Sequence, residues 1–172
     1  MIEQCLKEET GITKTPSENS RAVMLFEQNE YAEAFALFKR LAAEAPSVQS
    51  LNNMAWIYLR EEENMDEADR VLQQVPAFQP QSSFPYMMLG EISLFKQRYE
   101  QAKCYLQKAL AFSKTQEATY NLAIAHYQLS EFKSAAEMFA RCVGDSGMTQ
   151  LHEVVAWMDA GEHDKAKALL DG

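Results

Sequence analysis

Residues 99–110 read YEQAKCYLQKAL, and this stretch carries the pattern that decides the fold. Its apolar residues recur at spacings of three and four, with Ala102, Leu106 and Ala109 on one stripe, which is typical of an amphipathic helix. Residues 84–94 show the same spacing, and the polar residues 96–98 separate the two stretches. The sequence therefore predicts two helices joined by a short turn.

The same pair recurs along the chain. In each second helix a small residue is followed four positions later by a large apolar one, at intervals of 31 to 34 residues. The small residues are Ala34, Ala68, Ala102, Ala135 and Ala166, and the large ones are Phe38, Leu72, Leu106, Phe139 and Leu170. A second small series, on the first helices, is Ala22, Ala55, Gly90 and Ala123. Such side chains let antiparallel helices approach to about 8 Å, and stacking buries the apolar face that one pair leaves exposed. No run alternates with period two, so no strand is predicted.

The spacing of Leu89, Gly90, Tyr99, Ala102 and Leu106 resembles the tetratricopeptide repeat, and the match extends from about residue 15 to the C-terminus. The resemblance implies an all-α, right-handed α-solenoid of about five antiparallel helix pairs. It implies a single array over residues 15–172, with repeats of about 15–47, 48–82, 83–115, 116–147 and 148–172. The last repeat is degenerate and is interpreted as a cap. Residues 1–14 form an N-terminal segment, for which a short helix is one interpretation.

Local signals refine these helices. Ser47, Ser83 and Thr115 stand where helix N-caps are expected. Pro76 falls in the last turn of the second helix of the second repeat, where it cannot donate a backbone hydrogen bond. We therefore expect that helix to end early or to kink.

Charge and cysteine content limit the partners and the compartment. Sixteen Lys and Arg against 25 Asp and Glu give a net charge of −9, which disfavours nucleic acid and anionic membranes as partners. The cysteines, Cys5, Cys104 and Cys142, are odd in number and scattered, as expected for reduced thiols. There is neither a secretory leader pattern nor an apolar run of the ~18 residues that a membrane span needs. We therefore expect a cytoplasmic protein without membrane insertion.

The sequence offers little for catalysis. The stretch from His152 to Ala156 has the first half of a zinc-protease helix motif, but Ala156 replaces the second histidine. His126 is best interpreted as a hydrogen-bonded core residue, and His163 as a packing or surface residue. Neither Cys104 nor Cys142 has a base at a spacing that would activate it. We expect no enzyme, no catalytic residue, no metal site and no cofactor.

The resemblance places the first helices on a concave surface, and their free faces are the predicted peptide-binding site. The predicted residues are Asn52, Asn53, Trp56, Met87, Met88, Glu91, Tyr120, Asn121, Ile124 and Tyr127. Asn53 and Asn121 share one repeat position, where the family often uses an Asn side chain to bond the ligand main chain; an amide can both donate and accept. The alternative for each apolar residue is that it packs between neighbouring first helices and extends the core.

The charges of this surface point to a type of ligand. Family members that bind acidic chaperone tails use Lys and Arg in the groove, whereas this chain has none at Asn52, Met87, Met88 or Glu91. We therefore expect a segment with apolar anchors, and with basic residues to meet Glu91 and Glu117, from another protein or from a second copy of this chain. The predicted function is a non-catalytic adaptor or chaperone-like binder. The alternative is a self-assembly module that forms homo-oligomers through the groove or the terminal helices.

Overall fold

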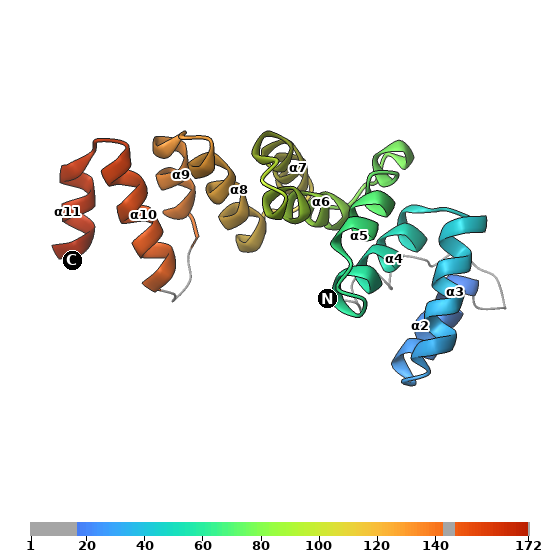
Figure 1. Ribbon diagram of the computed structural model, residues 1–172. Helices are drawn as coiled ribbons and strands as arrows, with labels where there is room; N and C mark the ends of the chain where they lie inside the picture. Colours follow the sequence, from blue (N-terminus) through green and yellow to red (C-terminus); the bar gives the residue numbers. More distant parts are fainter. Residues whose placement is uncertain (1–16, 143–146, 172) are drawn as a thin grey trace. The chain divides into compact units, whose positions relative to one another are not determined.

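The computed structural model describes residues 17–142 and 147–171, and the chain is all-α in these ranges (Figure 1). The described residues form ten α-helices and one short 3-10 helix, with no strand, so the predicted fold class is confirmed. The first helices of the pairs are α2 (Glu18–Glu27), α4 (Val48–Arg60), α6 (Phe84–Phe95), α8 (Gln116–Gln128) and α10 (Gly147–Asp159). The second helices are α3 (Tyr31–Glu44), α5 (Met65–Leu72), α7 (Tyr99–Phe112), α9 (Phe132–Phe139) and α11 (His163–Asp171). The N-terminal segment, residues 1–14, lies outside the described residues.

Side-chain caps start two of the first helices as predicted. At α4, Ser47 Oγ accepts from Ser50 N (3.1 Å) and Ser50 Oγ accepts from Ser47 N (2.8 Å), which forms a reciprocal capping box. At α8, Thr115 Oγ1 accepts from Ala118 N. Ser83 occupies the N-cap position of α6 as predicted, but its side chain makes no capping bond. Pro85 occupies the second position of α6 and removes one of the N–H groups that such a cap would satisfy.

The turn inside each pair has one recurring backbone feature. A residue with positive φ precedes the small residue of the second helix by five positions in every pair, and these residues are Asn29, Glu63, Gln97, Ser130 and Gly161. The next N–H then donates back into the first helix: Arg98 N to Ser93 O (2.8 Å) and Glu131 N to His126 O (2.9 Å). This is the left-handed C-terminal cap of a helix, although only one pair has glycine there.

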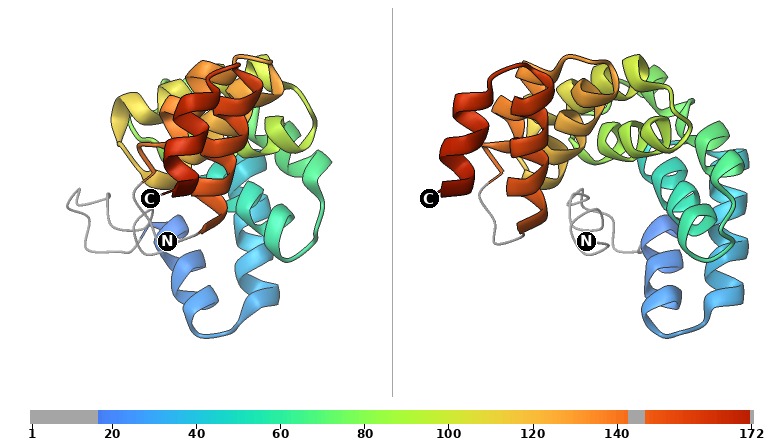
Figure 2. Two further views of the ribbon diagram at one scale, coloured as in Figure 1. Left: turned by 90° about the vertical axis from the view of Figure 1, so that its left-hand side faces the viewer. Right: turned by 60° about the vertical axis from the view of Figure 1, so that its left-hand side comes forward.

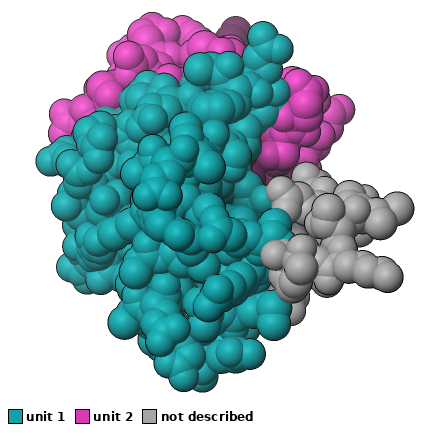
Figure 3. Space-filling model, turned by 90° about the vertical axis from the view of Figure 1, so that its right-hand side faces the viewer, with its two compact units in different colours: residues 1–80 teal, residues 81–172 magenta. Residues whose placement is uncertain are grey.

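The second pair departs from the others after α5. That helix ends at Leu72, and Val75–Phe78 form a 3-10 helix with Pro76 in its first turn, so the predicted early end is confirmed. Shortly afterwards the chain divides into two compact units, Met1–Pro80 and Gln81–Gly172, which we call unit 1 and unit 2 (Figure 3). Each unit is described by itself. The predicted single array over residues 15–172 stays a prediction.

Both series of small residues are buried where helices of a pair meet. Ala22, Ala34, Ala55 and Ala68 are fully buried in unit 1, and Ala102, Ala123 and Ala135 are fully buried in unit 2. Gly90 is packed most tightly, because a Cβ on it would lie 2.6 Å from Leu106 Cγ. In unit 2, α8 to α11 share a core that includes Phe139, Val154 and Trp157, and they stand as two neighbouring antiparallel pairs (Figure 2).

Ion pairs tie the turn of one helix pair to the second helix of the preceding pair. Lys39 of α3 bonds Glu62 (2.7 Å) in unit 1, and Lys103 of α7 bonds Glu131 (2.6 Å) in unit 2. The other carboxylate oxygen of Glu131 pairs with Nδ1 of the buried His126. The prediction of a hydrogen-bonded core histidine is therefore confirmed. Among the helices that the structure describes, none is both long and apolar enough to cross a bilayer.

Candidate functional site

The repeat register defines one comparable face on every first helix. Residues three before, one after and four after the small residue lie within about 60° of one another around a helix, because each residue advances by about 100°. Counting from Ala22 and Ala55 in unit 1, and from Gly90 and Ala123 in unit 2, this rule selects most of the predicted site. In α10 the register position belongs to Val154, twelve residues before Ala166, just as Ala123 stands twelve residues before Ala135. We call the residues on this face the inner positions.

In unit 1 the structure brings polar amides and aromatic rings together. Asn53 Nδ2 of α4 donates to Asn19 Oδ1 of α2 at 3.1 Å. The ring of Trp56 meets the ring of Phe26 edge to face, with centroids 5.5 Å apart. Asn52 is only 6% exposed, and its buried Oδ1 has no hydrogen-bond partner in the described structure. Asn53 and Trp56 are thus half-buried candidates for ligand contact, whereas Asn52 has almost no accessible surface.

In unit 2 the predicted methionines of α6 lie in the core. Met87 is 9% exposed and packs with Tyr86, Ala109 and Ala118, while Met88 is 4% exposed. The alternative interpretation, in which such side chains extend the core, describes both residues. Glu91 of the same helix is half-buried, and Asn121 Nδ2 of α8 approaches its Oε1 at 3.4 Å.

The tyrosines of α8 are held against α10. Tyr120 Oη shares a hydrogen bond with His152 Nδ1 (3.0 Å), and Tyr127 Oη donates to Asp159 Oδ2 (2.5 Å). Burial raises the pKa of Tyr120, and the hydrogen bond to Asp159 raises the pKa of Tyr127. Ile124, between them in sequence, is also partly buried and packs on the same α8–α11 core. The structure therefore brings these three predicted residues together on a single face.

Sequence reasoning missed a row of exposed apolar residues on α10. Leu151, Val155 and Met158 occupy the inner positions counted from Val154, and Met148 lies one turn further toward the N-terminus. Met148 is 61% exposed, Leu151 51% and Met158 50%, while Val155 is half-buried. The apolar spacing of three, four and three residues was visible in the sequence. The register of the shortened fifth repeat is hidden in the sequence, because Val154 stands where the other pairs have Ala or Gly.

Within residues 17–142 and 147–171, no three His, Cys, Asp or Glu side chains gather closely enough to hold a metal ion. Burial raises the pKa of Cys142, whose thiol lies near the carbonyl oxygen of Met138 at 3.5 Å. A raised pKa disfavours the thiolate, which is the nucleophilic form.

Comparisons with known proteins agree on the fold. Family models described as tetratricopeptide repeat match residues 25–92 and 85–115. No curated protein matches the sequence. A crystal structure of MamA protein is similar with a TM-score of 0.75 and 17% identity, over 91% of this chain and 90% of that chain. YrrB, described as a TPR protein with an unusual peptide-binding site, is similar with a TM-score of 0.77 and 18% identity, over 90% of this chain and 81% of that chain.

At such identities the solved structures show the fold alone. The two family models, however, together extend from residue 25 to residue 115, which is more than half of the 172 residues. The chain belongs to the tetratricopeptide repeat family.

Proposed function

We propose that this protein is a non-catalytic adaptor that binds a segment of another protein on the inner positions of its first helices, with Asn53 and Asn121, two residues before the small residue, at the edge of that face. Membership of the tetratricopeptide repeat family supports a role in protein–protein interaction. YrrB, which has the same fold, is described as having a peptide-binding site. The observation that carries the proposal is the exposed apolar row on α10 beside the partly buried tyrosines of α8. Apolar side chains concentrated on one face are typical of surfaces that bind other proteins.

The proposed contacts are divided between amides and apolar side chains. Asn53 uses its Nδ2 toward Asn19, so its Oδ1 is the atom that would accept from a ligand main-chain N–H. The 3.4 Å contact of Asn121 with Glu91 is long for a hydrogen bond, and a ligand carbonyl would displace it readily. Trp56, Tyr120, Ile124 and Tyr127 would supply rigid apolar area. Asn52, Met87 and Met88 are buried, so they are not among the proposed contacts.

Site-specific photo-crosslinking tests the proposal. A photoreactive phenylalanine at Trp56 or at Ile124 should capture a partner protein in cells, because both positions belong to the inner faces. The matched control is Phe112 on the second helix α7, which is 45% exposed and lies off these faces. Asn53→Ala with Asn121→Ala should then weaken binding of the recovered partner and leave the melting temperature nearly unchanged. Equal capture from Phe112, or unaltered binding by the double variant, would contradict the proposal.

Self-assembly is the second candidate function, and one observation favours it. Leu170 of α11 is 67% exposed, whereas the residues at its position in the other pairs, among them Leu106 and Phe139, are buried. A second copy could cover this residue. Light scattering over a concentration series decides the matter, since a protein that stays monomeric at high concentration does not assemble in this way.

A further inference from the structure

The row on α10 has an arrangement suited to another helix. Met148, Leu151, Val155 and Met158 follow spacings of three, four and three residues, so they form one stripe along α10. The stripe extends over ten residue steps, from Met148 to Met158, or about 15 Å at 1.5 Å per step. Its three most exposed members have half or more of their surface accessible.

The stripe contains no hydrogen-bonding side chain, and this limits what can lie on it. An extended peptide placed along the row would bury backbone N–H and C=O groups against apolar atoms, where each unpaired group is costly. A helix satisfies these groups internally and presents only its side chains. In unit 1, by contrast, Asn19 and Asn53 offer amides that suit an extended backbone. The α10 row therefore favours a helical ligand.

In unit 2, acidic and basic side chains lie on different helices. This distribution indicates which charges a ligand helix should carry beside its apolar face. The unit has nine Lys and Arg against eleven Asp and Glu, so it is almost neutral as a whole. Yet α6, α8 and α10 contain no Lys or Arg, while they carry the acids Glu91, Glu117, Glu153 and Asp159. All nine basic residues of the unit lie on second helices, in turns or in linkers.

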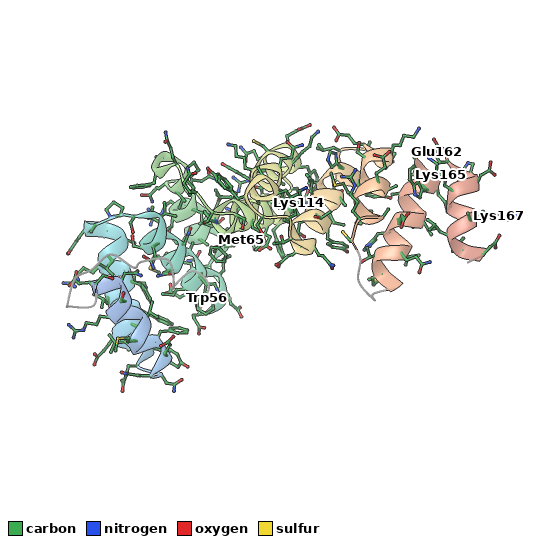
Figure 4. The ribbon with its side chains drawn as sticks, turned by 180° about the vertical axis from the view of Figure 1, so that it is seen from behind. Trp56, Met65, Lys114, Glu162, Lys165 and Lys167 are labelled. Atoms are coloured by element: carbon green, nitrogen blue, oxygen red, sulfur yellow. The ribbon has the colours of Figure 1, made fainter. Side chains whose placement is uncertain are left out.

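Arg141 precedes the stripe in sequence by seven residues, and Lys165 and Lys167 of α11 follow it. Lys165 lies over the ring of Trp157, 4.1 Å from the centroid, and also near Glu162 (3.7 Å). Glu162 is bonded in addition by Lys133 of α9 at 2.7 Å. Figure 4 labels Lys165 and Lys167 on α11 and Lys114 in the linker that follows α7. The first helices of unit 2, α6, α8 and α10, therefore carry no basic side chain of their own.

We propose that the α10 stripe, together with Tyr120 and Tyr127 of α8, is the docking face for an amphipathic helix with Lys or Arg along its flanks. This inference rests on the proposed function and specifies the partner. Leu151 and Met158 receive the apolar side of the ligand helix, in the ridge-and-groove packing that helices use with one another. Glu117 and Asp159 meet its basic side chains. Asp159 accepts from Tyr127 Oη through one oxygen, which leaves its charge and its other oxygen for the ligand.

Designed peptides test this proposal on the full chain. The probe is a fluorescent Leu/Lys peptide of about 14 residues whose leucines fall on one helical face, since four turns exceed the length of the stripe. A scrambled peptide of equal composition has no such face, and a Leu/Glu peptide has the face but the opposite charge. Fluorescence anisotropy should show binding of the Leu/Lys helix at least about tenfold tighter than of either control peptide. Binding should weaken when NaCl rises from about 50 to about 500 mM, because the charges are exposed.

Variants then locate the site. Leu151→Ser with Met158→Ser should weaken binding by about tenfold or more, because two buried apolar contacts are lost. Leu170→Ser is the matched control, since Leu170 is just as apolar and even more exposed but lies on α11. It should leave affinity unchanged. Circular dichroism should show equal helix content in all three proteins.

Several outcomes would overturn the proposal. Equal affinity for the scrambled peptide, equal loss with Leu170→Ser, or no binding of the Leu/Lys peptide would each reject the helix-docking face. If crosslinks from Trp56 and Ile124 still capture a partner in that case, the adaptor function survives without it. If light scattering instead shows a dimer that Leu151→Ser with Met158→Ser abolishes, the occupant is a second copy and the proposed partner is wrong.

Discussion

Gly90 is the residue where packing is least tolerant of change. It sits on α6 opposite Leu106 of α7, which is fully buried, and an added Cβ would lie 2.6 Å from Leu106 Cγ and 2.7 Å from its Cδ2. Carbon atoms pack at about 3.5–4.0 Å, so Leu106 would have to move within a filled core. The helix pair therefore requires glycine here, while its neighbours in the series use alanine.

We expect Gly90→Ala to destabilise the protein by about 1–2 kcal/mol. Overpacking costs about 1–3 kcal/mol, and the better helix propensity of alanine offsets part of it. Urea unfolding followed by circular dichroism measures the change. Gly147→Ala is the control, because nothing lies within 4 Å of its added Cβ. If Gly90→Ala is as stable as the parent protein, the close approach to Leu106 does not exist.

Glu131 links three helices of unit 2 through charge. Its hydrogen bonds with Lys103, and secondly with His126, hold the pKa of the Glu131 carboxyl below its ordinary value. A carboxyl whose pKa is lowered by folding stabilises the protein at pH values above its unfolded pKa. That contribution disappears as the pH falls through the folded-state pKa.

Glu131→Gln should therefore lower the melting temperature at pH 7, and the difference from the parent should shrink as the pH falls below about 4. Thermal melts from pH 3 to pH 7 measure it. Glu137→Gln, which changes an exposed acid of α9, should leave the melting temperature nearly unchanged throughout. A Glu131→Gln deficit that persists undiminished at pH 3 would show that the carboxylate charge does not stabilise the fold.

At the scale of elements, the turn within each helix pair is defined by its backbone more than by its sequence. Five different residues with positive φ occupy the same place, and Gly161 is the one glycine among them in the described chain. The left-handed conformation costs a non-glycine residue about 1–2 kcal/mol. Packing of the two helices and the recurrent back-bond, such as Arg98 N to Ser93 O, outweigh this cost.

Gln97→Gly should raise the unfolding free energy by up to about 1 kcal/mol, because glycine relieves the strain at φ 56° but loses some entropy on folding. The same replacement ten residues later, Gln107→Gly in the exposed middle of α7, should lower it by about 1 kcal/mol. Chemical denaturation of the two variants gives the comparison. Destabilisation by both would refute the left-handed turn at Gln97.

At the scale of the whole molecule, the chain comprises two compact units with different inner faces. Unit 1 presents Asn53 and Trp56, an amide beside a ring, whereas unit 2 presents the apolar stripe of α10 and the tyrosines of α8. The net charge of −9 is also unevenly shared, because unit 2 is close to neutral while its first helices carry only acids.

The sequence alone determined the helix pairs, the small contact residues and the early end of α5. These depend on local periodicity, on side-chain size and on proline, all of which act over a few neighbouring residues. It also determined which residues share the inner face of a helix, since a spacing of 3.6 residues per turn is enough to place Tyr120, Ile124 and Tyr127 together.

Only the tertiary structure decided which inner residues are accessible. Met87 and Leu151 occupy equivalent positions on their helices, yet Met87 is buried among Tyr86, Ala109 and Ala118 while Leu151 is half exposed. The accessibility of a side chain depends on what neighbouring helices pack against it. These neighbouring helices can be far away in the sequence. The exposure of the α10 stripe has the same cause, because it depends on the packing of neighbouring helices and not on the spacing of residues within α10.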